Sequence, residues 1–285
     1  MDERLGLEEV RRALAEDRAA DDVTTRLLGA SAERPARAAF VAEGRFVIAG
    51  LPMLRRVYGE LDSAAQVEAL HNDGDWTAPG AILARVSAAA GTLLAGERVA
   101  LNFLQRLSGV ATLTRRAVDA VAGTGARITH TRKTTPGLRA LERYAVTVGG
   151  GVLNRGSLAD AVLWKDNHWA LLAESDLAAA LAAAPPDMPL VVEVEDDLQL
   201  EQALTAGARH ILADNQPPER VASWVRRAGP TVLIQASGGI TPETARAYAE
   251  AGAALISIGA LTHSAPAAPI GCEIECKILS DLLPL

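Results

Sequence analysis

Cysteine is scarce in this chain, which has two among its 285 residues, Cys272 and Cys276. Both lie in the alternating apolar run 270–278, which predicts one face of a β-strand. Four residues of strand separate the two sulfur atoms by about 13 Å, at roughly 3.3 Å per residue, which is too far for a disulfide. No other Cys or His lies nearby at the spacing of zinc ligands, so we expect two reduced thiols in the core.

Long apolar runs and targeting signals are also missing. The longest apolar stretch, 177–186, has about ten residues, whereas a membrane span needs roughly twenty. The N-terminus carries Asp2 and Glu3 where a secretory signal needs a basic segment followed by an apolar run. We therefore expect no membrane association and a cytoplasmic location.

Aromatic residues make up only 4% of the chain, so aliphatic side chains must fill its core. The formal net charge is −7, and no basic tail or basic stripe interleaved with aromatic residues is present. A chain without this electrostatic footprint is not expected to bind nucleic acid. Its length favours two unequal domains over one core.

Positive charge is nevertheless concentrated in one segment, 128–168. Six basic residues gather there: Arg132, Lys133, Arg139, Arg143, Arg155 and Lys165. Because the net charge of the whole chain repels anions, a local cluster of this kind predicts a dedicated anion site.

The order of predicted elements indicates two kinds of fold. Apolar spacing predicts a helix over 5–16, and short runs at 38–42, 46–50, 66–70 and 82–86 predict an antiparallel sheet. Helices are predicted over 93–107 and 111–121, with a hinge at Ser108-Gly109. Seven short apolar runs then alternate with helical segments: 126–129, 147–152, 161–164, 190–194, 209–213, 231–236 and 254–258.

Strands alternating with helices predict parallel βα units, either in a closed barrel or in a doubly wound sheet. Glycine-containing loops at 236–240 and 258–260 favour the barrel, because late loops of such barrels often present backbone N–H groups to phosphate. The alternative is that these glycines serve only tight turns.

Two carboxylates, Glu193 and Asp214, lie at the ends of apolar strands. A carboxylate in such a place loses hydration unless it meets a cation or a metal. Beside a cationic cluster, this pair predicts Mg²⁺ and a polyphosphate substrate. Internal salt bridges to the same Arg and Lys residues are the alternative.

Nine collinear segments resemble the quinolinate phosphoribosyltransferase (nicotinate-nucleotide pyrophosphorylase) family. They are 97–102, 107–112, 131–139, 149–151 with Arg155, 165–168, 192–195, 214–215, 236–240 and 258–263. The resemblance spans almost the full length, and the sequences Thr-Arg-Lys-Thr-Thr-Pro-Gly-Leu-Arg and Lys-Asp-Asn-His are its most specific parts.

The resemblance implies that quinolinate and phosphoribosyl pyrophosphate, with Mg²⁺ and no organic cofactor, give nicotinate mononucleotide, pyrophosphate and CO₂ in NAD biosynthesis. It implies an α/β fold, with an N-terminal α/β sandwich domain (1–110, joined by a C-terminal strand within 268–285) and an incomplete seven-stranded parallel α/β barrel (111–267). It also implies a homodimer with a shared active site, and leaves assembly into hexamers open.

The roles of individual residues are likewise implied by the resemblance. Catalysis falls to Lys133, Glu193 and Asp214, of which Glu193 and Asp214 also hold the metal. Substrate binding falls to Arg98, contributed by the partner chain, and to Arg132, Lys133, Asn154, Arg155, Lys165, Ser237, Gly238 and Gly259.

Three residues depart from the family pattern: Asn154 replaces the usual His, His130 the usual Asp, and Gln235 the usual Glu. An Asn amide still donates two hydrogen bonds. We hypothesise that the loss of two negative charges, at His130 and Gln235, offsets the loss of a cationic group at Asn154; uncoupled drift is the alternative. Two other functions stay open, a paralogous enzyme for another aromatic acid and a non-catalytic nucleotide-binding protein.

Overall fold

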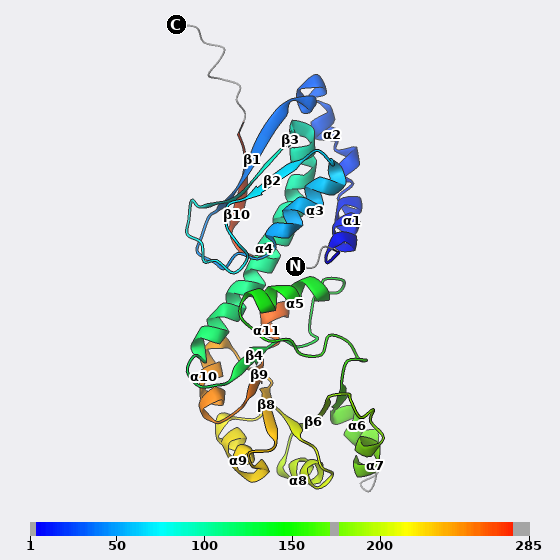
Figure 1. Ribbon diagram of the computed structural model, residues 1–285, viewed down its shortest axis with the longest axis vertical. Coiled ribbons are helices and arrows are strands. Elements are labelled where there is room, and N and C mark those ends of the chain that lie inside the picture. Colours follow the sequence, from blue (N-terminus) through cyan, green and yellow to red (C-terminus); the bar gives the residue numbers. More distant parts are fainter. Residues whose placement is uncertain (1–3, 172–176, 276–285) are drawn as a thin grey trace. The chain divides into compact units, whose positions relative to one another are not determined.

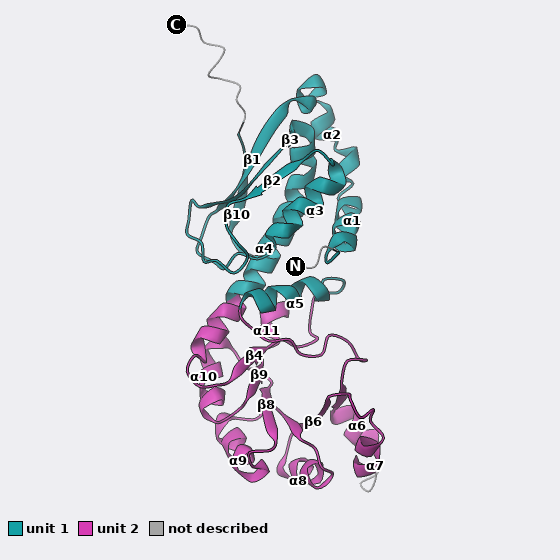
Figure 2. Cartoon of the chain, viewed as in Figure 1, with its two compact units in different colours: residues 1–112, 136–149, 265–285 teal, residues 113–135, 150–264 magenta. Residues whose placement is uncertain are grey.

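The computed structural model describes residues 4–171 and 177–275, which form two compact units (Figure 2). The first unit comprises 1–112, 136–149 and 265–285, and the second comprises 113–135 and 150–264. Residues 136–149, which lie inside the predicted barrel domain, thus group with the first unit. Cys276 and the end of the predicted strand 270–278 lie outside the described residues.

The sheet of the first unit is antiparallel, in the order β10-β1-β3-β2. Its strands are β1 (Pro35–Ala42), β2 (Gln66–Ala69), β3 (Ile82–Ala89) and β10 (Ile270–Glu275). Because β10 pairs with β1, the predicted return of the chain to the N-terminal sheet is confirmed. The predicted strand 46–50 contributes only one bridge, between Val47 and Trp76. Cys272 on β10 is a free thiol, and its partial burial raises its pKa to about 12.

Helices α1 (Leu7–Glu16), α2 (Val23–Arg26), α3 (Leu51–Leu61) and α5 (Arg139–Val148) complete the first unit. Helices α1 and α3 contact each other. The apolar side chains of α3 recur at helical spacing, and Met53, Leu54 and Val57 are fully buried. This burial of one helix face explains the formation of α3.

Helix α4 (Ala90–Ala120) is continuous, so the predicted hinge at Ser108-Gly109 is wrong. The two small residues serve close packing instead. A Cβ on Gly109 would lie 2.0 Å from the carbonyl oxygen of Pro266, and the buried Ser108 hydroxyl bonds both the N–H and the carbonyl of Ala49, at 3.0 and 3.2 Å. Glycine permits this approach of two backbones without breaking the helix.

The second unit contains a parallel sheet of six strands, in the order β4-β9-β8-β7-β6-β5. They are β4 (Arg127–Thr129), β5 (Val162–Trp164), β6 (Leu190–Val194), β7 (His210–Asp214), β8 (Leu233–Ser237) and β9 (Leu255–Ser257). Six of the seven predicted strands are therefore confirmed. The seventh, 147–152, is wrong over most of its length, because α5 continues through Val148 and only Val152 bridges to Thr129.

Helices of the second unit alternate with its strands, as the βα pattern predicts (Figure 1). They are α6 (Asp166–Leu171), α7 (Leu177–Ala182), α8 (Asp197–Thr205), α9 (Pro218–Ala228), α10 (Pro242–Glu250) and α11 (Ala260–His263). Helix α8 packs on β6, α9 on β8 and α10 on β9. The carboxyl ends of the parallel strands thus share one edge, where ligands bind in folds of this class.

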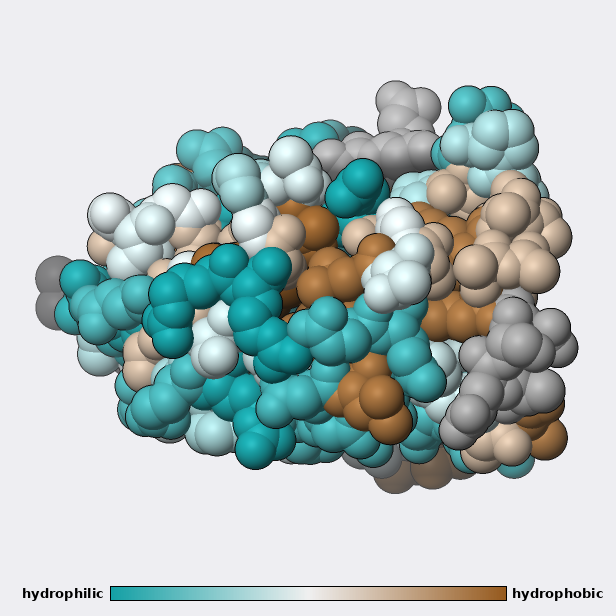
Figure 3. All heavy atoms as spheres, turned by 90° about the horizontal axis from the view of Figure 1, so that it is seen from below, coloured by the Kyte–Doolittle hydropathy of each residue, from teal (hydrophilic) through white to brown (hydrophobic). Residues whose placement is uncertain are grey.

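The surface carries several exposed apolar side chains, including Leu27, Leu158 and Leu171. On the face drawn in Figure 3, apolar residues gather between hydrophilic ones. No described helix is long and apolar enough to cross a membrane.

Candidate functional site

Nearly all the predicted site residues follow or end strands of the second unit. Arg132 and Lys133 follow β4, and Lys165 follows β5. Asn154 and Arg155 follow the bridge at Val152. Glu193 lies on β6, Asp214 on β7 and Ser237 on β8, while Gly238 follows β8 and Gly259 follows β9. Arg98 lies on α4 within the first unit and is exposed. Arg139 and Arg143 belong to α5, so four of the six clustered cations lie in the second unit.

Arg132 and Arg155 lie close enough at this edge for their charges to interact. Burial lowers the pKa of Arg155 and the neighbouring charge of Arg132 lowers it further, while the charges of Glu193 and Asp160 oppose the shift. The Arg155 guanidinium donates to the carbonyl of Ala161 at 3.2 Å, and Nε of Arg132 is buried without a hydrogen-bond partner among the described residues. Two guanidinium groups that repel each other in a half-buried site would be stabilised by an anion.

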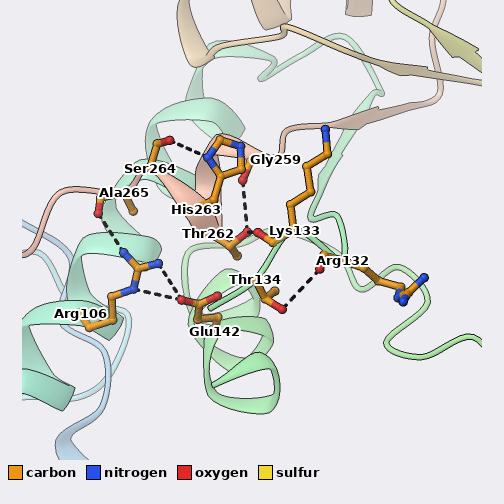
Figure 4. Close-up of polar contacts among 10 residues, drawn as sticks. All are labelled: Arg106, Arg132, Lys133, Thr134, Glu142, Gly259, Thr262, His263, Ser264 and Ala265. Atoms are coloured by element: carbon orange, nitrogen blue, oxygen red, sulfur yellow. Dashed lines mark hydrogen bonds and ion pairs between the residues drawn. The ribbon is translucent and has the colours of Figure 1, made fainter. Parts of the chain in front are cut away.

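The loop that carries Arg132 and Lys133 is held by its own hydrogen bonds and by α11 (Figure 4). The Lys133 N–H donates to Oγ1 of Thr131 at 3.1 Å, and the Thr134 N–H donates to the Arg132 carbonyl at 2.9 Å. The hydroxyl of Thr262, fully buried, donates to the Lys133 carbonyl at 2.8 Å. The backbone of Lys133 is thus fixed while its side chain remains exposed.

Gly259 lies between this loop and α11. A Cβ on Gly259 would be 3.1 Å from Nε2 of His263 and 3.4 Å from Cδ of Lys133. Nδ1 of His263 lies 2.6 Å from the hydroxyl of Ser264, which orients the ring. Gly259 and Lys133 were predicted from the sequence, whereas Thr262 was not; its signal in the sequence is a hydroxyl three residues after a strand-end glycine.

Lys165 and Glu193 form an ion pair, with Nζ 3.0 Å from Oε2. Glu193 is buried whereas the Lys165 side chain is 42% exposed. Burial raises the pKa of Glu193, while the hydrogen bond and charge of Lys165 oppose the rise. The indole N–H of Trp169 donates to the Glu193 carbonyl at 2.9 Å, so α6 also holds this strand end. The alternative of an internal salt bridge is thus realised for Glu193.

Asp214 ends β7 opposite Ser237 of β8. Its carboxylate accepts a hydrogen bond from Nδ2 of Asn215 at 2.7 Å, and the Asn215 N–H donates to the Ser237 carbonyl at 2.9 Å. Gly238 has φ 93°, and a Cβ there would lie 2.2 Å from Oδ1 of Asn215. Glycine is therefore required at 238 both for its conformation and for the approach of the two loops.

His130 and Asn154, two of the departures from the family pattern, contact each other. The Asn154 N–H donates to Nε2 of His130 at 3.2 Å, and Nδ1 of His130 lies 3.1 Å from the Thr131 carbonyl. A backbone N–H can only donate and a carbonyl can only accept, so the imidazole is neutral with its proton on Nδ1. His130 therefore adds no positive charge. The hypothesis that the loss of negative charge at His130 and Gln235 offsets the loss of a cationic group at Asn154 stays a prediction.

A metal could be held only by few protein ligands at this edge. No group of three or more His, Cys, Asp or Glu side chains suited to a metal occurs within residues 4–171 and 177–275. Glu193 and Asp214 are close enough for the charge of Asp214 to raise the pKa of Glu193. Two neighbouring carboxylates match the usual protein share of a Mg²⁺ site, whose remaining ligands are water and substrate phosphate.

A buried ion pair in the first unit was not predicted. Nη2 of Arg106 lies 2.6 Å from Oε1 of Glu142, whose side chain is fully buried. Nη1 of Arg106 also donates to the Ala265 carbonyl at 3.0 Å (Figure 4). Arg106 thereby joins α4, α5 and the segment that leads to β10. Sequence patterns carry no signal for this pair, since its partners lie 36 residues apart.

The comparison with known families covers nearly the whole chain. The sequence model described as "Quinolinate phosphoribosyl transferase, N-terminal domain" matches residues 22–108, and that of the corresponding C-terminal domain matches residues 110–272.

Individual relatives agree with this match. The chain is 41% identical over 272 residues to nicotinate-nucleotide pyrophosphorylase [carboxylating] from Mycobacterium leprae, covering 93% of this chain and 95% of that one. A probable enzyme of the same name from Bacillus subtilis is 39% identical, covering 85% and 84%. The crystal structure of nicotinate-nucleotide pyrophosphorylase from Ehrlichia chaffeensis superposes with a TM-score of 0.89 at 35% identity, covering 94% of this chain and 98% of that one.

Domain models that together span most of the chain, relatives above 30% identity over 84% or more of their length and a shared fold lead to one conclusion: this chain belongs to the quinolinate phosphoribosyltransferase family of pentosyl-transferring enzymes.

Proposed function

We propose that this chain transfers the phosphoribosyl group of phosphoribosyl pyrophosphate to quinolinate, with loss of CO₂, to give nicotinate mononucleotide and pyrophosphate. The observation that carries the proposal is the half-buried pair Arg132 and Arg155, whose like charges lie close together at the carboxyl edge of the parallel sheet. Such a pair suits a small planar dianion.

Quinolinate binds through its two carboxylates in this proposal. Each guanidinium presents a planar fork of donors that matches a carboxylate, and partial burial strengthens the interaction because water competes less. Asn154 lies next to Arg155 and can donate from its amide. The acceptor ring is thereby oriented with its nitrogen toward the ribose.

Phosphoribosyl pyrophosphate binds across the remaining strand ends. Lys133, whose side chain is exposed, and Lys165, which forms the ion pair with Glu193, supply positive charge for its phosphates. The turns at Ser237-Gly238 and Gly259 supply backbone N–H groups and, at Gly238, a backbone conformation open to close approach by a ligand.

Glu193 and Asp214 hold Mg²⁺ in this proposal, because two adjacent carboxylates together with substrate phosphates suit this ion. When bound, Mg²⁺ would supply positive charge beside the pyrophosphate of the substrate. The ion pair of Glu193 with Lys165 opposes the rise in the Glu193 pKa that burial causes.

The chemical steps then need mainly orientation and charge. The C1–O bond to pyrophosphate breaks as the quinolinate nitrogen attacks C1, and the carboxylates of Glu193 and Asp214 stabilise the positive ribose. After transfer, the bond from the ring to the departing CO₂ breaks, and its electron pair stays on the ring carbon, where the adjacent positive nitrogen stabilises it. A proton from water then takes the place of CO₂ on that carbon. Arg132 and Arg155 must release that carboxylate, so their binding cannot be stronger in the ground state than in the transition state.

A homodimer with a shared site is part of the proposal. Arg98 is exposed and has no hydrogen bond or ion pair to a described residue, and in this arrangement it reaches quinolinate bound to the partner chain. Assembly beyond a dimer is left to measurement of mass in solution.

The direct test is release of CO₂ and pyrophosphate from phosphoribosyl pyrophosphate with Mg²⁺, with quinolinate as acceptor and nicotinate run beside it. We expect turnover with quinolinate alone. Turnover with another aromatic acid but not quinolinate would support the paralogous enzyme. Binding of phosphoribosyl pyrophosphate without turnover on any acceptor would support a non-catalytic protein.

A further inference from the structure

A chain of hydrogen-bonded side chains crosses three neighbouring strands of the second unit. Nε2 of His210 on β7 lies 2.7 Å from Oε1 of Gln235 on β8, and Nε2 of Gln235 lies 2.5 Å from Oγ of Ser257 on β9. Gln235 is 1% exposed and Ser257 is 3% exposed. Buried amides of this kind are satisfied on both ends and hold their partners at fixed distances.

The direction of the hydrogen bonds follows from the groups involved. Oε1 of Gln235 accepts, so His210 donates from Nε2, and the Gln235 amide donates to the Ser257 hydroxyl. Burial lowers the pKa of His210, which agrees with a neutral ring. The chain of three residues therefore carries no charge, and each of its two hydrogen bonds has a donor and an acceptor.

The location of the chain relates it to the candidate site. Gln235 precedes Ser237 by two residues, and Ser257 precedes Gly259 by two. Residues two apart in a strand share one face and are about 7 Å apart. The link between Gln235 and Ser257 thus lies one step below the two loops that present Ser237, Gly238 and Gly259.

The two sides of β8 are held differently. Strands β7 and β8 share five register pairs, up to Asp214 opposite Ser237, and Asn215 bonds the Ser237 carbonyl beyond them. Strands β8 and β9 share two register pairs, Gln235 with Leu255 and Ala236 with Ile256. Above Ala236, no register pair joins β8 to β9 in the described part of the chain. The side-chain hydrogen bond from Gln235 to Ser257 therefore connects two strands that share few backbone pairs.

We propose that Gln235 is a positioning residue that acts through Ser257 to set the separation of the Ser237–Gly239 loop and Gly259. Its role is to preserve the affinity of these two loops for the phosphates of phosphoribosyl pyrophosphate. This inference rests on the proposed function, because it assigns those loops to that substrate. Gln235 itself contacts no substrate in this account.

The two hydrogen bonds of Gln235 provide a matched pair of variants. Ser257→Ala removes the link to β9, and His210→Leu removes the link to β7; each leaves one polar atom of the same amide without its partner. Both variants should lower the melting temperature. Only Ser257→Ala should raise KM for phosphoribosyl pyrophosphate, by about five- to tenfold, the range expected for one lost hydrogen bond. KM for quinolinate should stay unchanged in both.

A second variant and a binding measurement keep the test independent of turnover. Gln235→Met, which keeps the side-chain length and loses both hydrogen bonds, should match Ser257→Ala in the affinity for phosphoribosyl pyrophosphate measured by calorimetry. The positioning role would be overturned if Ser257→Ala and His210→Leu lowered the affinity for phosphoribosyl pyrophosphate equally, or if Ser257→Ala left this affinity unchanged.

The two proposals can fail separately. If the wild-type protein binds phosphoribosyl pyrophosphate but does not turn over quinolinate, the proposed function is wrong. The calorimetric comparison of the variants would still test the role of Gln235. A wild-type protein that does not bind phosphoribosyl pyrophosphate would overturn both.

Discussion

Arginine is used differently in the two units of the molecule. In the first unit Arg106 meets the fully buried carboxylate of Glu142 at 2.6 Å, and its other nitrogen bonds a carbonyl. In the second unit the like charge of Arg132, after burial, lowers the pKa of Arg155 most, while the charges of Glu193 and Asp160 oppose this. The first arrangement is a direct ion pair, whereas the two arginines of the second form none with a described residue.

The difference shows that an arginine side chain can stabilise the fold or bind a ligand, depending on whether a carboxylate of the protein pairs with it. A buried guanidinium with its carboxylate in place stabilises the packing of three segments, and loss of the partner would leave an uncompensated charge. A pair of guanidiniums that forms no ion pair with a carboxylate among the described residues can bind an incoming anion directly. The ion pair of Lys165 and Glu193 stands between these cases, because it is satisfied but half exposed.

The largest effect should come from a change in the pair Arg132 and Arg155. We expect Arg155→Leu to lower kcat/KM for quinolinate by about 10³-fold, since it removes one charged fork from a dianion in a half-buried site. For Arg155→Lys we expect a kcat/KM between those of the wild-type protein and Arg155→Leu, because an ammonium keeps the charge but cannot bind a carboxylate bidentately. Steady-state kinetics measure both. Arg246→Leu is the control, as Arg246 forms an exposed pair with Glu250, and an equal loss there would contradict the assignment.

The buried pair of the first unit should affect stability instead. Glu142→Gln leaves the charge of Arg106 without its carboxylate and should lower the free energy of unfolding by about 3 kcal/mol, measured by urea denaturation. Glu60→Gln, which breaks the exposed pair with Arg11, is the matched control and should have a much smaller effect. If both changes cost the same, the contrast between buried and exposed pairs would not hold for this protein.

A smaller effect is expected from the bond that holds the cationic loop. Thr262→Val keeps the volume of a buried side chain but removes the hydrogen bond to the Lys133 carbonyl, which should lower kcat/KM about fivefold. Thr262→Ser keeps the hydroxyl and should retain most of the activity. A loss in Thr262→Ser that is absent from Thr262→Val would show that the methyl group, not the hydroxyl, matters.

The smallest effect concerns the pH dependence of stability. Burial raises the pKa of Glu193 in the folded protein above its ordinary value of 4.5. Between the ordinary and the raised pKa the folded state binds more protons than the unfolded state, so this group makes stability fall as pH rises through that window. Glu193→Gln should remove this fall, as measured by denaturation between about pH 4 and pH 7. An unchanged pH profile would contradict the raised pKa.

Local patterns in the sequence were sufficient for most of the elements. The run of short apolar strands with helices between them predicted six strands of the parallel sheet, and alternation at Ile270–Ile274 predicted β10. Prediction failed where two patterns overlap. Thr147 and Val148 resemble the start of a strand, but Leu141, Ala145 and Val146 bury one face of α5 and the helix continues to Val148.

The candidate site was predicted in its residue types but not in its connections. The sequence by itself placed Arg132, Arg155, Glu193 and Asp214 at strand ends, because strand periodicity and the chemistry of side chains are local properties. Only the tertiary structure showed that Glu193 pairs with Lys165, that Thr262 holds Lys133, and that Gln235 joins three strands. These contacts join residues 22 to 129 positions apart, and no local pattern encodes which distant strands become neighbours.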